Sequence, residues 1–404
     1  ARSAGVNSAA LPPTATGRAK VSALEAAGAL RALRPLAGAW ALSHREHFAH
    51  AGGVILAAVE TLLDEALARA PAVLREVTRL ERQRGLGLGF TRLDVVLPEG
   101  APEAFSVLEV QAGDPSAMGW SDALAEALGG AATLMPSHRR RFEALTPGRR
   151  IAFVVPEGSI VESDHRLLAG HYAAHGWQAT CVDPRALAFA GGQLSAAGAP
   201  VDAVFRDAWD ELFLPRAEGG GEALVSAVAA GAVAMLNPFV ATLADDKGWL
   251  EALSTPSRWP TETARVLATH VPCTRLVRER RVDWEGRQVD FPRHLEQQQE
   301  WLVLKPADGY GGADVTVGPT VTAAQWRTAL ERALGAPDTF VAQRHCPLPR
   351  QPVFVLDEPE PRLANVVHSL WFHPELAGAF VRASDGPVVN VHRGGGLGPV
   401  FFES

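Results

Sequence analysis

The segment from Trp301 to Val317 constrains the fold of this chain more than any other part of its sequence. It reads Trp301-Leu-Val-Leu-Lys305-Pro-Ala-Asp-Gly-Tyr-Gly-Gly-Ala-Asp-Val-Thr-Val317, an apolar run that ends at a lysine and passes through a glycine-rich turn into a second strand pattern. A lysine can neutralise phosphate charge, and glycines let backbone N–H groups approach phosphate oxygens. Because the lysine precedes the glycines, the spacing matches neither a P-loop nor a dinucleotide fingerprint. The segment predicts a triphosphate-binding hairpin or, equally well, an ordinary hairpin with a solvated lysine.

Length and composition narrow the class of protein. At 404 residues the chain exceeds a comfortable single core, so two or three domains are expected. A net charge of −7 argues against a nucleic-acid partner, and no apolar run approaches the ~18 residues of a membrane span. The three cysteines, Cys181, Cys273 and Cys346, form no C-x-x-C pair, which fits a reducing cytosol and excludes a cysteine-built zinc site. We therefore expect a cytoplasmic protein that binds neither nucleic acid nor membrane.

The N-terminal part is expected to be mainly helical. Residues 1–18 have no periodicity and predict an irregular lead-in, whereas leucine spacing from Val21 to Leu80 predicts helices. Alternating residues then predict two strands, Thr91–Leu97 and Phe105–Gln111, joined by a turn rich in proline and glycine. These two strands are predicted to pair as an antiparallel hairpin.

After Pro147 and Gly148 the pattern changes to alternating strands and helices. The predicted strands are 151–155, 178–182, 203–206 and 232–236, and the predicted helices are 165–175 and 222–230. Such alternation indicates a parallel sheet with helices on both faces. Beyond it we expect a helix from Leu243 to Leu253 that carries Lys247, the lysine strand, a helix at 322–334, and strands at 339–343, 365–372, 379–382 and 388–393.

Two short motifs carry a second set of polar residues, Arg92-Leu-Asp94 and Glu109-Val-Gln111. Residues two apart on a strand point to the same face, so neighbouring strands would bring these side chains together. Oxygen ligands of this kind suit Mg²⁺ that bridges nucleotide phosphates, and an arginine beside them would face a transferring phosphate. The alternative is a surface ladder of salt bridges between two strands.

Three further segments have the composition of a ligand site. Lys247 follows a strand and the Asn237-Pro238 dipeptide, although a lysine on a solvated helix face is the more ordinary interpretation. The strand ending in Gln343-Arg344-His345-Cys346 breaks into prolines and could offer free backbone groups to an adenine ring. Arg382 and the Asn390–Arg393 segment precede three glycines, a loop able to close over a ligand. No nucleophile motif or zinc-protease motif occurs, and the histidines show no metal-ligand spacing.

The order of these motifs resembles the circularly permuted ATP-grasp enzymes, which include the glutathionylspermidine synthase-like carboxylate–amine ligases. In that family an R-x-D strand and an E-x-N strand precede an α/β region, and an N-P…N-K segment and a K-P-x-x-G-x-x-G loop follow. The corresponding residues here are Arg92-x-Asp94, Glu109-x-Gln111, Asn237-Pro238…Asp246-Lys247 and Lys305-Pro-Ala-Asp-Gly309-Tyr-Gly-Gly312. The resemblance spans roughly residues 90–400, and Gln111 stands where the family usually has asparagine.

The resemblance implies an α/β protein with a circularly permuted ATP-grasp fold and a Rossmann-like pre-ATP-grasp domain. Residues 1–146 would contain N-terminal helices and the permuted strands of the ATP-grasp C-lobe, and residues 147–240 the pre-ATP-grasp domain. Residues 241–345 would form the N-lobe with the glycine-rich loop. Residues 346–404 would complete the C-lobe.

It also implies ATP and Mg²⁺ as cofactors and assigns roles to individual residues. The Mg²⁺ ligands would be Asp94, Glu109 and Gln111, and Arg92 and Arg382 would stabilise an acyl phosphate. The nucleotide would contact Lys247, Lys305, Gly309, Gly311, Gly312, Gln343, Arg344, His345 and Cys346.

The implied activity is an ATP-dependent carboxylate–amine or peptide ligase that acts through an acyl phosphate. Its partners would be a small-molecule carboxylate and an amine or peptide, and a homodimer is compatible with the sequence. Two alternatives stay open. One is a phosphotransferase on the same fold, which would pass phosphate to a hydroxyl or to a protein histidine. The other is a catalytically silent nucleotide-binding or scaffold protein, which the glutamine at position 111 makes conceivable.

Overall fold

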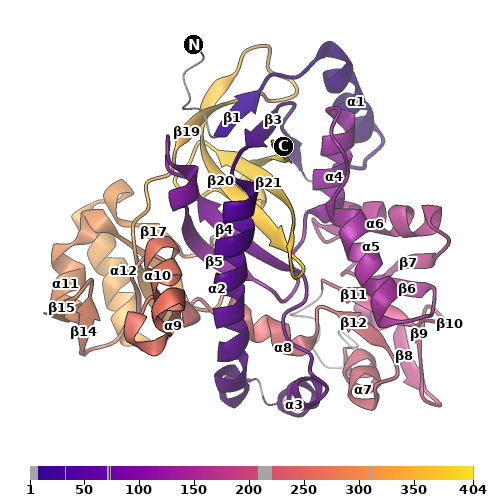
Figure 1. Ribbon diagram of the computed structural model, residues 1–404, viewed down its shortest axis with the longest axis horizontal. Helices are drawn as coiled ribbons and strands as arrows, with labels where there is room; N and C mark the ends of the chain where they lie inside the picture. The colour runs from indigo at the N-terminus through magenta and orange to yellow at the C-terminus, as the bar shows by residue number, and fades with distance from the viewer. Residues whose placement is uncertain are drawn as a thin grey trace.

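A nine-stranded sheet forms the centre of the protein. The computed structural model describes residues 8–31, 33–70, 72, 74–207, 221–309 and 311–403. The strand order is β1-β3-β22-β21-β20-β4-β5, with β19 beside β20 and β2 beside β22 (Figure 1). The strands are β1 (Ser8–Leu11), β2 (Arg34–Pro35), β3 (Ala39–Leu42), β4 (Thr91–Val96), β5 (Ser106–Gln111), β19 (Arg350–Val353), β20 (Arg362–Phe372), β21 (Leu376–Ser384) and β22 (Gly396–Phe402). Segments from both ends of the chain therefore share one sheet.

The predicted hairpin β4–β5 lies next to the C-terminal strands. β4 pairs antiparallel with β5 and with β20, which places Asp94 opposite Ser369. The long helix α2 (Arg45–Ala66) packs across these strands, and its Ile55 belongs to the same buried cluster as Leu93 (Figure 1). On the other face Phe380 of β21 packs with residues of α4 (Met118–Ala127). Because both faces of the sheet are covered, every residue of β4 is buried.

Residues 150–236 contain the predicted parallel sheet, in the order β12-β11-β6-β7. Its strands are β6 (Arg150–Val154), β7 (Gln178–Val182), β11 (Ala203–Arg206) and β12 (Ala234–Leu236). Alternate residues of β6 point to opposite faces, so Phe153 packs with one helix pair and Val154 with the other. The two pairs are α5 (Leu134–Leu145) with α6 (Glu162–Ala174), and α3 (Arg75–Gln83) with α7 (Glu222–Ala230). The prediction of helices on both faces is confirmed.

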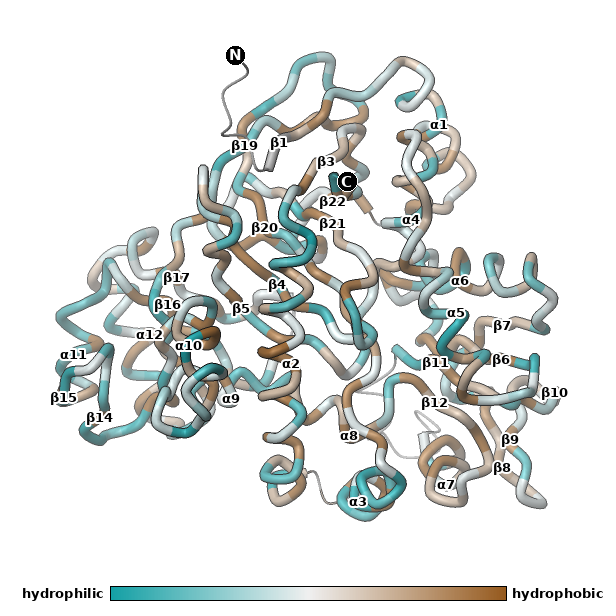
Figure 2. The backbone as a smooth tube through the Cα atoms, in the orientation of Figure 1, coloured by the Kyte–Doolittle hydropathy of each residue, from teal (hydrophilic) through white to brown (hydrophobic). Residues whose placement is uncertain are grey.

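The strand that ends near Lys305 belongs to a third sheet, in the order β13-β18-β16-β17. Trp326 of the covering helix packs with Leu302 and Leu304, so the alternating Val303 and Lys305 face the opposite side. The elements are β13 (Thr274–Leu276), β16 (Leu302–Pro306), β17 (Thr316–Val317), β18 (Phe340–Arg344), the helices α10 (Thr261–His270), α11 (Phe291–Gln297) and α12 (Ala323–Gly335), and the hairpin β14 (Arg281–Trp284) with β15 (Arg287–Asp290). Figure 2 shows that this hairpin and α3 are hydrophilic and peripheral.

Two predictions for the N-terminal part are wrong. Residues 8–11 of the predicted irregular lead-in form β1, and α1 (Ala15–Ala26) begins within it, while residues 1–7 lie outside the described residues. The predicted helical run from Val21 to Leu80 is interrupted by β2 and β3. β3 pairs in parallel with β22 from the other end of the chain, and local periodicity carries no signal for so distant a partner.

Lys247 does not lie on a helix as predicted. The segment from Leu243 to Leu253 divides into a 3-10 turn, Leu243–Asp245, and α9 (Trp249–Leu253), with Lys247 in the connection between them. The backbone N–H of Lys247 donates to the carbonyl of Ala307 at 2.8 Å instead of to a preceding helical turn. Contact with the third sheet therefore overrides the helical pattern here.

The predicted strand at 388–393 is also absent from the described structure. The 3-10 turn Val391–Arg393 is followed by Gly394 and Gly395 and then by β22, which begins at Gly396, so the three glycines lead into a central strand. A small antiparallel sheet that was not predicted contains β8 (Leu187–Ala190), β9 (Gln193–Ala196) and β10 (Ala199–Pro200). Among the described helices, none has the length and apolarity needed to cross a membrane. The four proposed domain boundaries stay a prediction.

Candidate nucleotide site

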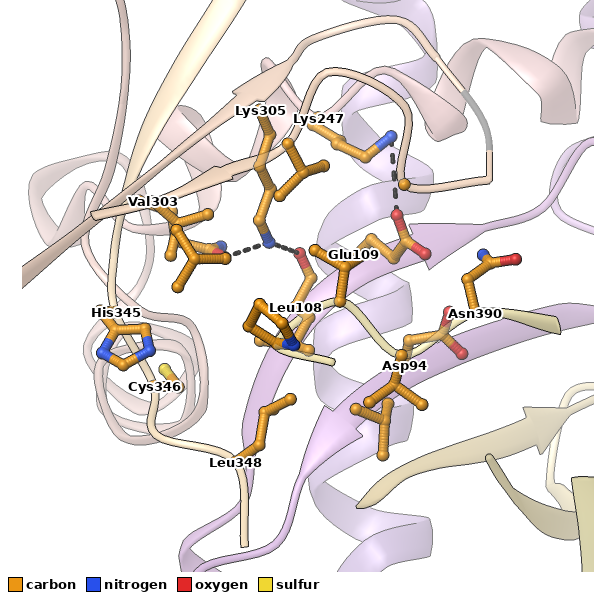
Figure 3. A pocket seen from close by; sticks show the side chains of 18 of the residues that line it. Asp94, Leu108, Glu109, Lys247, Val303, Lys305, His345, Cys346, Leu348 and Asn390 are labelled. Atoms are coloured by element: carbon orange, nitrogen blue, oxygen red, sulfur yellow. Dashed lines mark hydrogen bonds and ion pairs between the residues drawn. The ribbon is translucent and has the colours of Figure 1, made fainter. Parts of the chain in front are cut away.

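One cavity lies between the central sheet and the third sheet, and most of the predicted site residues line it (Figure 3). Among the described residues, Arg92, Gln111 and Gly311 do not belong to this lining. The predicted residues that do are Asp94, Glu109, Lys247, Lys305, Gly309, Gly312, Gln343, Arg344, His345, Cys346 and Arg382. The cavity measures about 120 Å³, which is less than the ~300–1,000 Å³ of typical ligand pockets. Lysine side chains that reach across it occupy part of the space (Figure 3).

Lys305 reaches from β16 across to β5. Its Nζ donates to Gln343 Oε1 at 2.6 Å and to the carbonyl of Leu108 at 3.3 Å. Burial of the ammonium and the nearby Lys247 lower the pKa of Lys305 to about 8, although Glu109 acts in the opposite direction. Both hydrogen-bond acceptors are neutral, so an anionic ligand that displaced them would supply the missing charge compensation.

Lys247 connects the glycine turn to β5. Its Nζ donates to the carbonyl of Gly309 at 2.9 Å and lies 3.5 Å from Glu109 Oε2. The residue is 9% exposed, so the ammonium is held between these two partners. The two lysines therefore enter the cavity from different chain segments and both lie near Glu109 (Figure 3).

The glycine turn between β16 and β17 closes one side of the cavity. Gly311 and Gly312 have φ values of 67° and 69°, in the left-handed region that favours glycine. A Cβ at Gly312 would also lie 2.5 Å from Val388 Cγ1. Glycine is therefore required at Gly312 both by backbone conformation and by close packing, while Tyr310 lies outside the described residues.

The segment from Gln343 to Cys346 lines the cavity but is not the free strand edge that was predicted. β18 lies between β13 and β16, and Gln343 pairs with both neighbours. The N–H of Arg344 donates to the carbonyl of Cys273, and the N–H of His345 donates to that of Trp301, both at 2.8 Å. These two backbone donors are therefore already in use.

Asp94 is fully enclosed by cationic and hydroxyl donors. Arg92 donates to both of its oxygens at 3.0 and 3.2 Å, Arg382 Nη2 lies 2.7 Å from Oδ2, and Ser369 Oγ donates to Oδ1 at 2.7 Å. Burial alone would raise the pKa of Asp94, but Arg382 and Arg92 hold it well below its usual range. A carboxylate has about four acceptor positions, and all four are occupied here.

The two predicted arginines differ in their access to the cavity. Arg92 also donates to the carbonyl of Ser116 and lies over the rings of Trp371 and Phe380, so it acts on the cavity through Asp94. Arg382 lines the cavity directly. Its Nε is buried and has no hydrogen-bond partner among the described residues, a donor that an anion could use.

Glu109 is the carboxylate in this site that best suits Mg²⁺. It lies opposite Asp94 across the β4–β5 ladder, and its Oε1 accepts from Gln111 Nε2 at 3.0 Å. No group of three or more His, Cys, Asp or Glu side chains suited to a metal exists within the described ranges. Mg²⁺ commonly takes only one or two carboxylates together with substrate phosphates and waters. Glu109, with Asp94 adjacent, therefore fits a nucleotide-bridging ion, whereas Gln111 outside the lining fits it less well.

Buried side chains outside the cavity hold the β4–β5 hairpin in place. Asn237, of the predicted Asn-Pro motif, accepts from the N–H of Phe90 at 2.7 Å and donates to the carbonyl of Ala112 at 2.6 Å. Asp245 accepts from the N–H groups of Ala112 and Gly113, and burial raises its pKa to about 7. The open end of the hairpin, where β4 begins and β5 ends, is thereby fixed to the chain between β12 and α9.

Several residues of this site were missed by sequence reasoning. Ser369 contacts Asp94 from a position 275 residues further along the chain, and no motif around it indicates this role. Apolar residues that no motif singled out also line the cavity, among them Val303 of β16, Val317 of β17, Val367 of β20 and Val388 after β21. Strand alternation could have identified Val303 as facing the same side as Lys305.

Comparison with known proteins identifies the family. A family model described as circularly permuted ATP-grasp type 2 matches residues 163–368, about half of the chain. Among curated proteins, no sequence matches this chain significantly.

Solved structures share the fold at low sequence identity. A glutathione synthetase-like effector, GSS30, from Globodera pallida in its apo form aligns with a TM-score of 0.57 and 10% identity over 96% of each chain. A putative gamma-glutamylcysteine synthetase from Methylobacillus flagellatus KT aligns with a TM-score of 0.46 and 11% identity over 82% of each chain. At such identities the first likeness shows the fold alone. Together with the family match it confirms the predicted circularly permuted ATP-grasp fold.

Proposed function

Because the chain belongs to the circularly permuted ATP-grasp type 2 family, a family of ATP-dependent carboxylate–amine ligases, we propose that it joins a carboxylic acid to an amine at the expense of ATP. The carboxylate would attack the γ-phosphorus to give an acyl phosphate and ADP. The amine would then attack the acyl carbon, with release of phosphate. The product would be an amide or a peptide bond.

The observation that carries this proposal is the meeting of opposite charges in one cavity. Lys247, Lys305, Glu109 and Arg382 come from four separate segments of the chain and line the same space beneath a glycine turn. Lys305 donates to two neutral oxygens, and Lys247 contacts one neutral oxygen and the carboxylate of Glu109. A triphosphate could replace these partners. An ordinary hairpin with a solvated lysine would not bury the ammonium in this way.

Each residue then has a task that follows from its position. Lys305 and Lys247 would bind phosphate oxygens, and the turn at Gly309–Gly312 would cover them with its backbone. The Gln343–Cys346 segment at the other end of the cavity would take the adenine. Arg382 would donate its unused Nε to the acyl phosphate as negative charge develops there.

Arg92 and Asp94 would position Arg382 rather than contact the nucleotide. Asp94 binds the guanidinium groups of both arginines and would thereby hold the guanidinium of Arg382 in a fixed orientation beside the cavity. Mg²⁺, when bound, would be held mainly by Glu109 and would compensate the charge of the phosphates. The site works chiefly by placing reactants and balancing their charge.

One observation favours the silent alternative, a protein that binds nucleotide without turnover. Asp94 is saturated by protein donors and Gln111 lies outside the cavity lining, so among the described lining residues Glu109 alone is available as an anionic metal ligand. A phosphotransferase on the same fold would use the same cavity but no amine.

The test is ADP formation by the full chain with Mg²⁺ and ATP. Candidate carboxylic acids are added singly and then together with amines, and ADP and phosphate are measured. A requirement for both acid and amine, with an amide in the product, supports the ligase. Phosphate transfer without an amine would establish the phosphotransferase instead. ATP binding without any turnover across the acid and amine panel would support the silent protein.

A further inference from the structure

A second pocket adjoins the nucleotide cavity at the segment after β21. It measures about 480 Å³, within the ~300–1,000 Å³ range of ligand sites. Three arginines from distant parts of the chain line it, Arg34, Arg362 and Arg393. Among the described lining residues Asp385 alone is acidic, so the lining of this pocket carries more positive than negative charge.

Regular pairing of the central sheet builds this pocket. Arg34 lies on β2 and pairs with Gly396 of β22. Because Gly396 follows Arg393 closely in the chain, this pairing brings Arg34 and Arg393 to the same pocket. Arg362 is the first residue of β20. Asn365, on the same strand, donates to the carbonyl of Gly386 at 2.8 Å and thereby fixes the segment that lines both cavities.

The arginines are only partly compensated within the protein. Arg34 pairs with Glu358 at 2.9 Å, and Arg362 pairs with Asp385 at 2.6 Å and with Glu358 at 3.6 Å. These side chains are 29–39% exposed for the arginines and 35–63% for the acids, so water screens the pairs. Arg393 is exposed and makes no direct ion pair among the described residues; its acidic neighbour Asp314 is already paired with Arg332. An incoming anion would therefore meet at least one guanidinium without a direct ion pair.

The second pocket and the nucleotide cavity adjoin, because they share part of their lining. Val315, Val317, Pro387 and Val388 line both cavities. Val388 packs against Gly312 of the glycine turn, and Arg393 Nε lies 3.7 Å from where a Cβ of Gly312 would be. A ligand in the second pocket would thus lie beside the turn that is proposed to cover the phosphates.

We propose that this pocket binds a carboxylate of the acid substrate, and that the substrate is therefore a dicarboxylic acid or a peptide with a free carboxylate. This assignment of substrate class rests on the proposed ligase function. Arginine forks match carboxylate geometry and form charge-assisted hydrogen bonds. The first carboxylate would receive phosphate near Arg382, while the second would hold the molecule at Arg34, Arg362 and Arg393.

The test separates binding in this pocket from turnover. Titration calorimetry of the full chain without nucleotide uses succinate, glutarate and L-glutamate, with glutaramide as the neutral isostere and inorganic phosphate as a second anion. We expect at least one dicarboxylate to bind and glutaramide not to bind. Arg393→Gln and Arg362→Gln should weaken that binding about tenfold, as expected for lost charge-assisted contacts. Arg265→Gln is the matched control, because Arg265 is an exposed arginine that pairs with Glu262 of α10 and lines neither cavity.

Three results would overturn the proposal. They are no binding of any dicarboxylate, equal binding by the parent chain and both pocket variants, and tighter binding of phosphate than of every dicarboxylate with the same arginine dependence. Failure of the ligase function is a separate outcome, recognised by dicarboxylate binding that persists without ADP formation. Where turnover is found, Arg393→Gln should raise KM for the acid about tenfold and leave KM for ATP unchanged.

Discussion

The two walls of the nucleotide cavity are both charged but are built in opposite ways. On the lysine wall, Lys247 and Lys305 bind backbone carbonyls, a side-chain amide and one carboxylate at 3.5 Å. On the aspartate wall, Asp94 is bound by two arginines and a serine that fill all its acceptor positions. The lysine wall holds charge that is poorly compensated, whereas the carboxylate of the aspartate wall is fully bound, with Arg382 Nε left as a donor without a partner among the described residues.

This difference separates residues that bind a ligand from residues that hold the site together. A buried ammonium with neutral partners is costly in the empty protein and gains when an anion arrives. A buried ion pair with every donor satisfied gains little from a ligand, and removing one member leaves an uncompensated charge. Substitutions on the lysine wall should therefore change affinity, and those on the aspartate wall should change stability.

The largest expected effect is on the stability of the aspartate wall. Asp94→Ala leaves Arg92 and Arg382 buried without their shared carboxylate and should destabilise the protein by ~3–5 kcal/mol. Lys305→Met is the control on the opposite wall and should change stability by less than ~1 kcal/mol, because it removes a costly buried charge. Urea unfolding followed by circular dichroism measures both. Equal losses for the two variants would contradict the comparison.

The next effect is on turnover and concerns the carboxylate between the walls. Glu109→Gln keeps the size of the side chain but removes the charge available to Mg²⁺, so ADP formation should fall on the order of a hundredfold, or ~2.7 kcal/mol. Gln111→Asn should retain activity, since Gln111 lies outside the lining. The assay is Mg²⁺-dependent ADP release by variants with a native circular-dichroism spectrum. Parental turnover by Glu109→Gln would place the metal elsewhere.

A smaller effect is expected on nucleotide affinity from the lysine wall. Lys305→Met should weaken ATP binding about tenfold or more, which corresponds to the ~1.5–3 kcal/mol of a charge-assisted contact. Calorimetry with ATP and Mg²⁺ measures the change, and Arg265→Gln, an exposed position on α10 away from the cavity lining, serves as the unaffected control. An unaltered affinity in both the Lys305 and Lys247 variants would remove the lysine wall from the nucleotide site.

The smallest effect is a dependence of nucleotide affinity on pH. Burial lowers the pKa of Lys305 to about 8, so its ammonium loses the proton as pH rises through this value and ATP affinity should fall several-fold between about pH 7 and about pH 9. The folded chain releases this proton before the unfolded chain does. Stability relative to Lys305→Met should therefore rise between about pH 8 and about pH 10.5.

Calorimetry and urea unfolding across this range check both signs. Lys305→Arg keeps its charge throughout and should flatten the affinity profile. A parent profile that matches Lys305→Arg would show that Lys305 does not titrate in contact with the nucleotide.

Predictions from sequence succeeded where the pattern and its partner are close in the chain. The β4–β5 hairpin and the parallel strands of residues 150–236 follow local alternation and short connections, and the structure contains them. The predictions for β3 and for residues 388–393 failed because those segments are organised by pairing between the two ends of the chain. The prediction that Lys247 lies on a helix also failed because of a distant contact, since the backbone N–H of Lys247 donates to the carbonyl of Ala307, just after β16.

The sequence by itself determined the chemical identity of the site. Short motifs in the sequence contain Lys247, Lys305, the glycine turn, Asp94 and Glu109. In the two strand motifs, alternation also predicts that residues two apart share one face. Only the tertiary structure decided which of them contact one another. Asp94 is saturated by Arg382 and Ser369 from β strands hundreds of residues away, and whether a charged group is compensated depends on neighbours in space, which the order of residues does not specify.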